Sequence, residues 1–164
     1  MKIQGKDKVS NLVETVVLKK GGEEFIFKAQ PVNDYDAFHL LCPTPEPPSI
    51  TYPNGEKGQD VSDEGYIKKI DDYASYRTHW MVLESLKATD DLEWSTVKEN
   101  EPESWKNYGD ELQAFGFSQL EVSNLINIVT DACGLNQKKI NDATESFLAR
   151  QVAKASESAK NTGR

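Results

Sequence analysis

The sequence predicts an α+β fold that is mainly α, with an N-terminal β-hairpin, a long helix and a C-terminal bundle of three shorter helices. Three observations support this class. Segments rich in Val, Ile and Phe flank Gly21-Gly22, apolar residues recur at helical spacing from Ser62 to Thr89, and helix-capping residues recur after residue 100. A chain of 164 residues is long enough to bury one core.

The sequence predicts a single globular domain over residues 1–152 and a flexible tail over 153–164. Within the domain we expect the hairpin in residues 1–32, a short helix and a Pro-rich loop in 33–61, and the helical core in 62–152. The tail contains no large apolar side chain, so it cannot bury enough apolar surface to offset the entropy lost on ordering.

A β-hairpin is predicted by Val9–Leu18 and Glu24–Val32, which lie on either side of Gly21-Gly22. Glycine tolerates the positive φ of a tight hairpin turn, and Val, Ile and Phe favour strands. In the second strand Phe25 and Phe27 share one face because side chains alternate along a strand. Two strands alone are marginally stable, so the hairpin should pack on a helix or pair with another chain's edge.

A short helix is expected at Tyr35–Leu41, with Asn33 or Asp34 as its cap and with Phe38 and Leu41 facing inward.

Residues 42–61 are predicted to form one long loop without regular structure. Four prolines within Pro43–Pro48 fix φ and remove backbone donors. A rigid connector from hairpin to helix is the favoured interpretation, and a PxxP ligand for an SH3-type domain is the alternative. The role of the Pro-rich stretch Cys42–Pro53 stays open.

The stretch Ser62–Thr89 is predicted to be one long helix that forms the spine of the core. Ser62 serves as the N-cap, and Asp63 and Glu64 place negative charge where the helix dipole favours it. No proline interrupts the stretch. Its apolar side chains recur every three or four residues, at Ile67, Ile70, Tyr73, Tyr76, Trp80, Met81, Leu83 and Leu86.

Three shorter helices are predicted from their start and stop signals, which are proline in a first turn, a Ser-x-x-Glu capping box, and glycines after the last turn. The first helix covers Pro102–Phe115 and ends before Gly116. The second begins at the capping box of Ser118 and Glu121 and ends at Gly134, and the third begins at Asn136 or Gln137.

The net charge of −8 is concentrated in residues 60–112, which carry fourteen Asp or Glu against six Lys or Arg. Nucleic-acid binding needs a basic face, so this distribution argues against nucleic acid as the partner. A solvated acidic face and an acidic surface that meets a basic protein are the two interpretations. No membrane-spanning apolar run or secretory signal is present in the sequence, so we expect a cytoplasmic protein that does not bind a membrane.

The sequence has no recognisable catalytic motif. It lacks GxSxG, P-loop, GxGxxG and HExxH patterns, and we expect no enzyme activity, no cofactor and no metal site. His39, Cys42, His79 and Cys133 lack metal-ligand spacing.

Large aromatic residues are the candidates for contact with a partner. Trp80 is expected in the core because of its helical register. Partner binding is expected either at the hairpin edge, through Phe25 and Phe27, or in the acidic region, through Trp94 and Trp105. A helix-turn-helix over residues 118–150 is a weaker alternative, because its second helix has little excess of basic residues.

Four stretches, together with the order of hairpin, Pro-rich loop and long helix, resemble the tail assembly chaperones of long-tailed bacteriophages. They are Trp80–Leu86, Leu92–Val97, Ser118–Val129 and Lys139–Ala149. The Pro-rich stretch is longer than this family leads one to expect, and the resemblance assigns no binding residue in this sequence.

The resemblance implies a non-enzymatic chaperone that binds the tape measure protein and promotes assembly of the tail tube. Its implied partners are the tape measure protein and the tail tube protein, and self-association is a further expectation. It would act in the cytoplasm of the infected bacterium and be absent from the mature virion. The alternatives are a virion structural or other protein-interaction subunit, and a helix-turn-helix regulator that binds nucleic acid.

Overall fold

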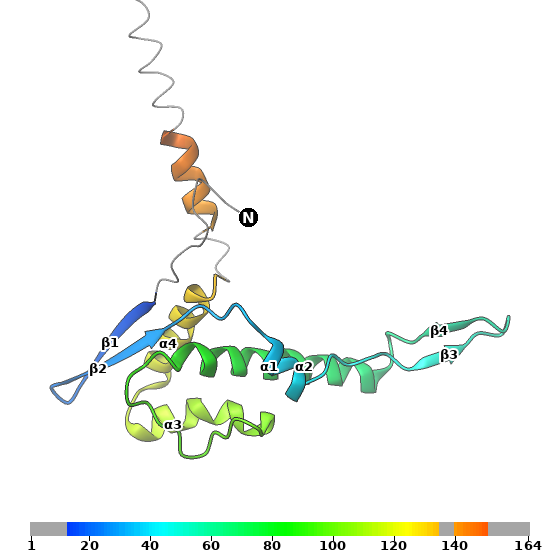
Figure 1. Ribbon diagram of the computed structural model, residues 1–164, viewed down its shortest axis with the longest axis horizontal. Coiled ribbons are helices and arrows are strands. Elements are labelled where there is room, and N and C mark those ends of the chain that lie inside the picture. Colours follow the sequence, from blue (N-terminus) through cyan, green and yellow to red (C-terminus); the bar gives the residue numbers. More distant parts are fainter. Residues whose placement is uncertain (1–12, 135–139, 151–164) are drawn as a thin grey trace, which may run out of the picture. The chain divides into compact units, whose positions relative to one another are not determined.

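The computed structural model describes residues 13–134 and 140–150. Its contacts divide the chain into two compact units, Met1–Cys133 and Gly134–Arg164. Figure 1 shows an N-terminal hairpin, a long helix and then shorter helices. The predicted α+β class, mainly α, is therefore confirmed.

Strands β1 (Glu14–Lys20) and β2 (Glu23–Ala29) pair antiparallel and form the predicted hairpin. The turn consists of Gly21 and Gly22, whose φ angles are 60° and 87°. Positive φ at both turn residues gives the backbone twist that matches the flanking strands. Lys20 lies opposite Glu23, so the register leaves no bulge.

Helix α1 (Asp36–Leu41) is shorter than predicted by one residue. Its N-cap is Tyr35 and carries no side-chain capping bond, whereas Asp34 Oδ1 accepts the N–H of Asp36 at 2.8 Å in a local turn. Phe38 is fully buried, as predicted, but Leu41 is exposed. The inward orientation predicted for Leu41 is wrong because so short a helix places only one side chain fully against the core.

The prediction of a loop without regular structure over residues 42–61 is wrong. Strands β3 (Ser49–Thr51) and β4 (Lys57–Gln59) form a second antiparallel hairpin. The prolines lie outside both strands, where they remove no ladder bond. The ring of Tyr52 lies across Gly58, where an added Cβ would approach it to 2.6 Å. A glycine at that position therefore permits the ring to cover the strand.

Helix α2 (Glu64–Leu86) begins after Asp63, whose carboxylate accepts the N–H of Tyr66 at 2.7 Å. The predicted cap, Ser62, instead donates its hydroxyl to Asp60 at 2.6 Å. Ser62 is bonded within the preceding turn, so Asp63 takes the capping role and the predicted start is wrong.

The buried residues of α2 all lie in its last two turns, from Trp80 to Leu86. In the preceding turns Ile67 is exposed, and Tyr73 and Tyr76 are half-buried against Phe38 and Trp105. The prediction that the whole helix forms the spine of the core is therefore wrong for these turns, where only one side of the helix is covered.

The predicted helix over Pro102–Phe115 consists of two elements. Pro102–Asn107 is a 3₁₀ helix, η1, and α3 (Tyr108–Phe115) follows it directly. The hydroxyl of Ser104 donates to the carbonyl of Glu101 at 2.7 Å, a bond that suits the tighter turn. Gly116, with φ of 125°, ends α3 as predicted.

Helix α4 (Gln119–Ala132) has the predicted capping box. Ser118 Oγ accepts the N–H of Glu121 at 3.3 Å, and Glu121 Oε2 accepts the N–H of Ser118 at 2.7 Å. Both N-terminal donors are thereby satisfied. The same carboxylate pairs with Lys20 Nζ at 3.0 Å, which joins the end of β1 to α4.

The core of the first unit lies where β2, α1, the end of α2, η1, α3 and α4 meet. Its most deeply buried large side chains are Phe38, Val82, Leu86, Trp105, Leu125 and Val129.

Two hydroxyl side chains near the end of α2 fasten the outer edge of β2 to it. Ser85 Oγ donates to the carbonyl of Gln30 at 2.7 Å, and the N–H of Gln30 donates to the Ser85 carbonyl at 3.0 Å. Thr89 Oγ1 accepts the N–H of Lys28 at 2.9 Å and donates to its carbonyl at 3.1 Å. Four hydrogen bonds therefore connect two segments more than fifty residues apart.

In the second unit, residues 140–150 are helical, in agreement with the predicted last helix. Ile140, Phe147 and Leu148 are exposed there. The predicted start at residue 136 or 137 and the predicted tail lie outside the described residues, and the single domain over 1–152 stays a prediction. No helix within residues 13–134 or 140–150 is long and apolar enough to cross a membrane.

We predict that Trp80→Ala lowers the free energy of unfolding by about 3–5 kcal/mol, because the indole is buried against Tyr35 and Phe38. Ile67→Ala on the same helix is the control and should cost about 1 kcal/mol or less, because Ile67 is exposed. Urea denaturation measures both. Equal effects of the two substitutions would contradict the assignment of the core to the last two turns of α2.

A second prediction concerns acid. Hydrogen bonds from Ser118 and the ammonium of Lys20 lower the pKa of Glu121 from 4.5 to about 2. The folded-state pKa lies below that of the unfolded chain, so the stabilisation is complete above about pH 4.5 and is lost as the pH falls towards 2. The difference in urea midpoint between wild type and Glu121→Gln should therefore shrink between pH 6 and pH 2.5, measured in about 0.1 M salt.

Lys20→Met is the matched control, because it removes the ion pair and leaves the capping box in place. Its effect at pH 6 should be smaller than that of Glu121→Gln. A midpoint difference for Glu121→Gln that stays constant over this pH range would show that the carboxylate does not stabilise the fold.

Candidate functional site

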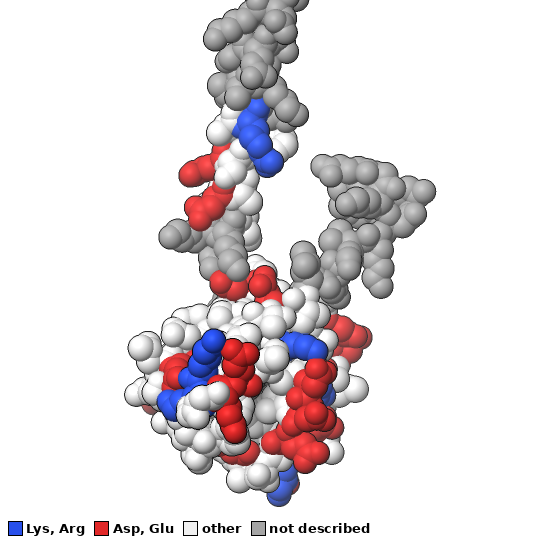
Figure 2. All heavy atoms as spheres, turned by 90° about the vertical axis from the view of Figure 1, so that its left-hand side faces the viewer, with Lys and Arg blue, Asp and Glu red and all other residues white. Residues whose placement is uncertain are grey.

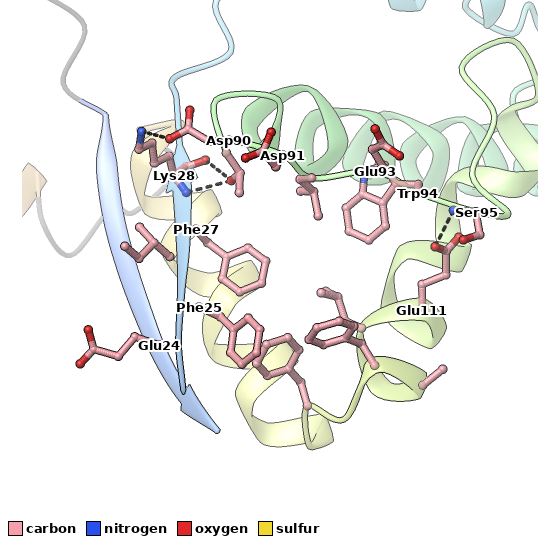
Figure 3. Close-up of a pocket in the computed structure, with 17 residues that line it drawn as sticks. Glu24, Phe25, Phe27, Lys28, Asp90, Asp91, Glu93, Trp94, Ser95 and Glu111 are labelled. Carbon is pink, nitrogen blue, oxygen red and sulfur yellow. Dashed lines mark hydrogen bonds and ion pairs between the residues drawn. The ribbon is translucent and has the colours of Figure 1, made fainter. Parts of the chain in front are cut away.

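An open groove of about 900 Å³ lies between β2, the segment of residues 89–95 and α3. Figure 3 shows β2 on one side of this groove and Trp94 and Glu111 on the opposite side. Its volume is within the range of ligand-binding sites in proteins. Five aromatic side chains line it, those of Phe25, Phe27, Trp94, Phe115 and Phe117.

Strand β2 supplies two of these rings. Phe25 and Phe27 both point from the strand into the groove (Figure 3) because they are two residues apart. Phe27 is buried, and Phe25 is half-buried. The Phe25 ring meets Phe115 and Phe117 edge-on, with centroid distances of 5.3 and 5.6 Å. The β2 rings and the end of α3 therefore form one continuous apolar wall.

Phe115 is the most accessible ring of this wall. Its side chain is 66% exposed, whereas Phe117 is buried. The two rings stack at 5.6 Å across Gly116, whose positive φ reverses the chain between α3 and α4. The turn after α3 thus presents one ring to solvent and the other to the core.

Trp94 faces the β2 rings from a segment that has no regular secondary structure. Glu111 of α3 holds the residues that follow it. Its carboxylate accepts the backbone N–H groups of Ser95 at 2.8 Å, Thr96 at 2.6 Å and Val97 at 3.2 Å. Three donors on one carboxylate fix the path of this segment and with it the position of the indole.

The pKa of Glu111 reflects this arrangement. Burial favours the neutral acid, but the hydrogen bonds from Ser95, Thr96 and Val97 outweigh burial and hold the pKa below its ordinary value. The carboxylate is therefore ionised at neutral pH and acts as an acceptor for all three amides.

Carboxylates surround the apolar floor. Lys28 is the basic residue in the lining and forms an ion pair with Asp90. Neither Asp91 nor Glu93 forms an ion pair with any described residue. Figure 2 views the chain from the side of the β1–β2 turn and shows a strip of acidic side chains on that face. The acidic residues of the lining are Glu24, Asp90, Asp91, Glu93 and Glu111.

The structure brings together three of the four residues predicted to contact a partner. Phe25, Phe27 and Trp94 line the same groove, although the sequence left the hairpin edge and the acidic region as alternatives. Trp105 does not belong with them, because it is 1% exposed and its Nε1 donates to the carbonyls of Lys98 and Glu99. Its burial makes it a core residue, so Trp105 has no exposed side chain to offer a partner.

Sequence reasoning missed Phe115 and Phe117 as groove residues. Their signal is the Phe-Gly-Phe pattern at the predicted end of a helix, since a glycine with positive φ there separates two aromatic side chains in space.

The groove offers apolar contact and aromatic stacking through its rings. Its polar side chains are five carboxylates, Lys28, Thr89 and Ser95. Among the described residues, no group of three His, Cys, Asp or Glu side chains is arranged to hold a metal ion. Comparison with protein-family models, with curated proteins and with solved structures found no match for this chain.

We predict that Glu111→Gln loosens residues 95–97 and with them Trp94. The neutral amide is a weaker acceptor than the carboxylate, so the amide of Thr96 should exchange with solvent roughly tenfold faster. Hydrogen exchange followed by NMR measures this. Asp110→Asn, on the neighbouring exposed position of α3, is the control. Unchanged exchange at Thr96 in Glu111→Gln would show that the carboxylate does not hold this segment.

Proposed function

We propose that this protein is a non-enzymatic chaperone of phage tail assembly that binds the tape measure protein and promotes assembly of the tail tube. The observation that carries the proposal is the open aromatic groove formed by β2, residues 89–95 and α3. The sequence resemblance to tail assembly chaperones supports the same function.

A groove of this kind suits a client with exposed apolar segments. Phe115 is largely exposed, and Phe25 and Trp94 are half-buried beside it. Contiguous apolar surface of this type is uncommon on proteins that act alone and marks sites where a partner binds. A long client with exposed apolar segments would aggregate. In this proposal the groove binds one short apolar segment at a time and shields it from other chains.

The acidic rim supports a protein partner over a nucleic acid. Five carboxylates and one lysine line the groove, so a phosphate backbone would be repelled from it. The same charge keeps the chaperone itself in solution while its apolar floor is open.

In this proposal the chaperone acts in the cytoplasm of the infected bacterium and leaves before the particle is complete. The tail tube protein is its second partner, recruited once the tape measure protein is covered. A virion structural subunit could use the same groove for a permanent partner, and its retention in purified particles distinguishes that alternative.

We predict that co-expression with the tape measure protein raises the soluble yield of that protein severalfold, and that Phe115→Gln removes most of this gain. Leu120→Gln is the matched control. Both side chains are exposed, Phe115 by 66% and Leu120 by 70%, so neither substitution should destabilise the fold by more than about 1 kcal/mol. Of the two, Phe115 lines the groove.

The soluble fraction of the tape measure protein, compared on gels across wild type and both variants, is the measurement. Equal yields with and without a well-folded wild-type chaperone would overturn the proposed function. Equal losses in Phe115→Gln and Leu120→Gln would retain a chaperone but place its client site outside the groove.

A further inference from the structure

The backbone of β2 has one edge paired with β1 and one edge that faces the groove. In a two-residue hairpin turn the residues that flank the turn exchange hydrogen bonds, so Glu23 is paired with Lys20. Hydrogen-bonded pairs then recur at every second residue. Phe25, Phe27 and Ala29 therefore direct their N–H and C=O groups to β1.

The intervening residues of β2 direct theirs away from β1. Contacts with residues at and just after the end of α2 confirm this alternation independently. Thr89 forms hydrogen bonds with both backbone groups of Lys28, and Ser85 forms them with both backbone groups of Gln30. Glu24 and Ile26 follow the same phase. No hydrogen bond from any described residue outside the hairpin reaches the backbone of either one.

This unpaired stretch of edge opens into the groove. Consecutive residues from Glu24 to Lys28 line it, which places the groove beside the strand and not over one of its faces alone. In Figure 3, β1 lies on one side of β2 and the groove on the other. The edge is available from Glu24 to Ile26 and ends at Lys28, where Thr89 occupies it.

We propose that the edge of β2 at Glu24 and Ile26 takes an extended, apolar and basic segment of a partner protein as an added strand. The proposal rests on the proposed function, since it specifies how the same groove would recognise its client. Two N–H and two C=O groups supply the backbone hydrogen bonds, and an edge of this kind is a template for strand addition.

The groove also defines the side chains of the added strand. Those on the face of Phe25 and Phe27 would enter the space that Trp94 bounds on the far side, so large apolar residues at alternate positions fit there. A basic residue at the end of the segment beside Lys28 would lie on the side of Asp91 and Glu93 (Figure 3), which have no ion-pair partner among the described residues. A helix offers no free backbone groups along its side and would leave the edge unpaired.

The test uses a synthetic hexapeptide, Lys-Thr-Phe-Thr-Val-Lys with both ends blocked, added to the ¹⁵N-labelled full chain. We expect shifts of the Glu24 and Ile26 amides and of the Trp94 indole. Two further peptides carry backbone N-methyl groups, one on both Thr residues and the other on Phe and Val. N-methylation blocks an N–H donor, and alternate residues of a strand direct their N–H groups to opposite edges. If the peptide binds as a strand, the N-methylated peptide whose blocked groups face β2 should lose roughly tenfold in affinity, and the other should lose little.

Two proline variants of the protein test whether the peptide pairs with the groove-facing edge of β2. Ile26→Pro removes an N–H that faces the groove, whereas Val17→Pro removes one that faces the outer edge of β1. The two residues lie opposite each other and are 53% and 46% exposed. Ile26→Pro should weaken the peptide roughly tenfold and Val17→Pro little. A far-UV spectrum like that of wild type verifies that each variant keeps its hairpin.

Charge is tested with a double variant, Asp91→Asn with Glu93→Gln. Asn tolerates the positive φ of 54° at position 91. Asp71→Asn with Asp72→Asn removes the same charge from α2, outside the groove. At low salt the groove variant should lose roughly threefold to tenfold in affinity for the peptide, and the α2 variant little.

Equal loss from both N-methylated peptides, equal effects of the two proline variants, or no binding at millimolar peptide would overturn strand addition. Shifts of the Ile26 amide with protein concentration alone would show that a second copy occupies the edge, and would overturn the assignment to a partner. Retained rescue of the tape measure protein by Ile26→Pro would contradict this inference and leave the proposed function standing. Peptide binding at this edge without any rescue of the tape measure protein would support strand addition and contradict the proposed function.

Discussion

The hydrogen bonds of Ser85 and Thr89 to the backbone of β2 fix the position of the N-terminal hairpin. A two-stranded hairpin has too little buried surface to be stable alone, and its outer edge offers unpaired groups to any neighbour. The hydroxyls of Ser85 and Thr89 satisfy three backbone groups of Lys28 and Gln30, and the Ser85 carbonyl satisfies the fourth. Phe27 and Ala29 are then held in the core, where both are buried. Together with the Lys20–Glu121 ion pair and the contact of Phe27 with Phe117, these bonds orient the hairpin against the helices.

The same end of α2 determines the groove. The chain leaves the helix beside β2 and continues to Trp94, with Lys87 paired to Glu84 at 2.8 Å and to Glu99 at 3.1 Å. Glu111 holds the next residues from α3. Both walls of the groove are thus positioned from elements of the core, although Trp94 itself lies in a segment without regular structure. Such support is what a binding site on a loop requires in order to keep its shape.

Local signals in the sequence were sufficient for the elements that depend on local chemistry. The turn at Gly21-Gly22, the capping box at Ser118 and the stop at Gly116 require particular residue types at particular positions, and each was predicted. The second hairpin was missed because its strands have three residues each, too few for an alternating pattern. Burial was less predictable, because which turns of α2 are covered and whether Trp105 lies in the core depend on contacts between distant segments.

The acidic rim has a physical consequence for an open apolar groove. Two copies that joined groove to groove would bring their two acidic rims together. Like charges at an interface cost free energy that apolar burial must offset, so this arrangement is disfavoured. A partner with basic residues meets no such penalty. The charge around Phe25 and Phe115 therefore discriminates between self-association through this groove and capture of a client, while leaving other faces of the protein free to self-associate.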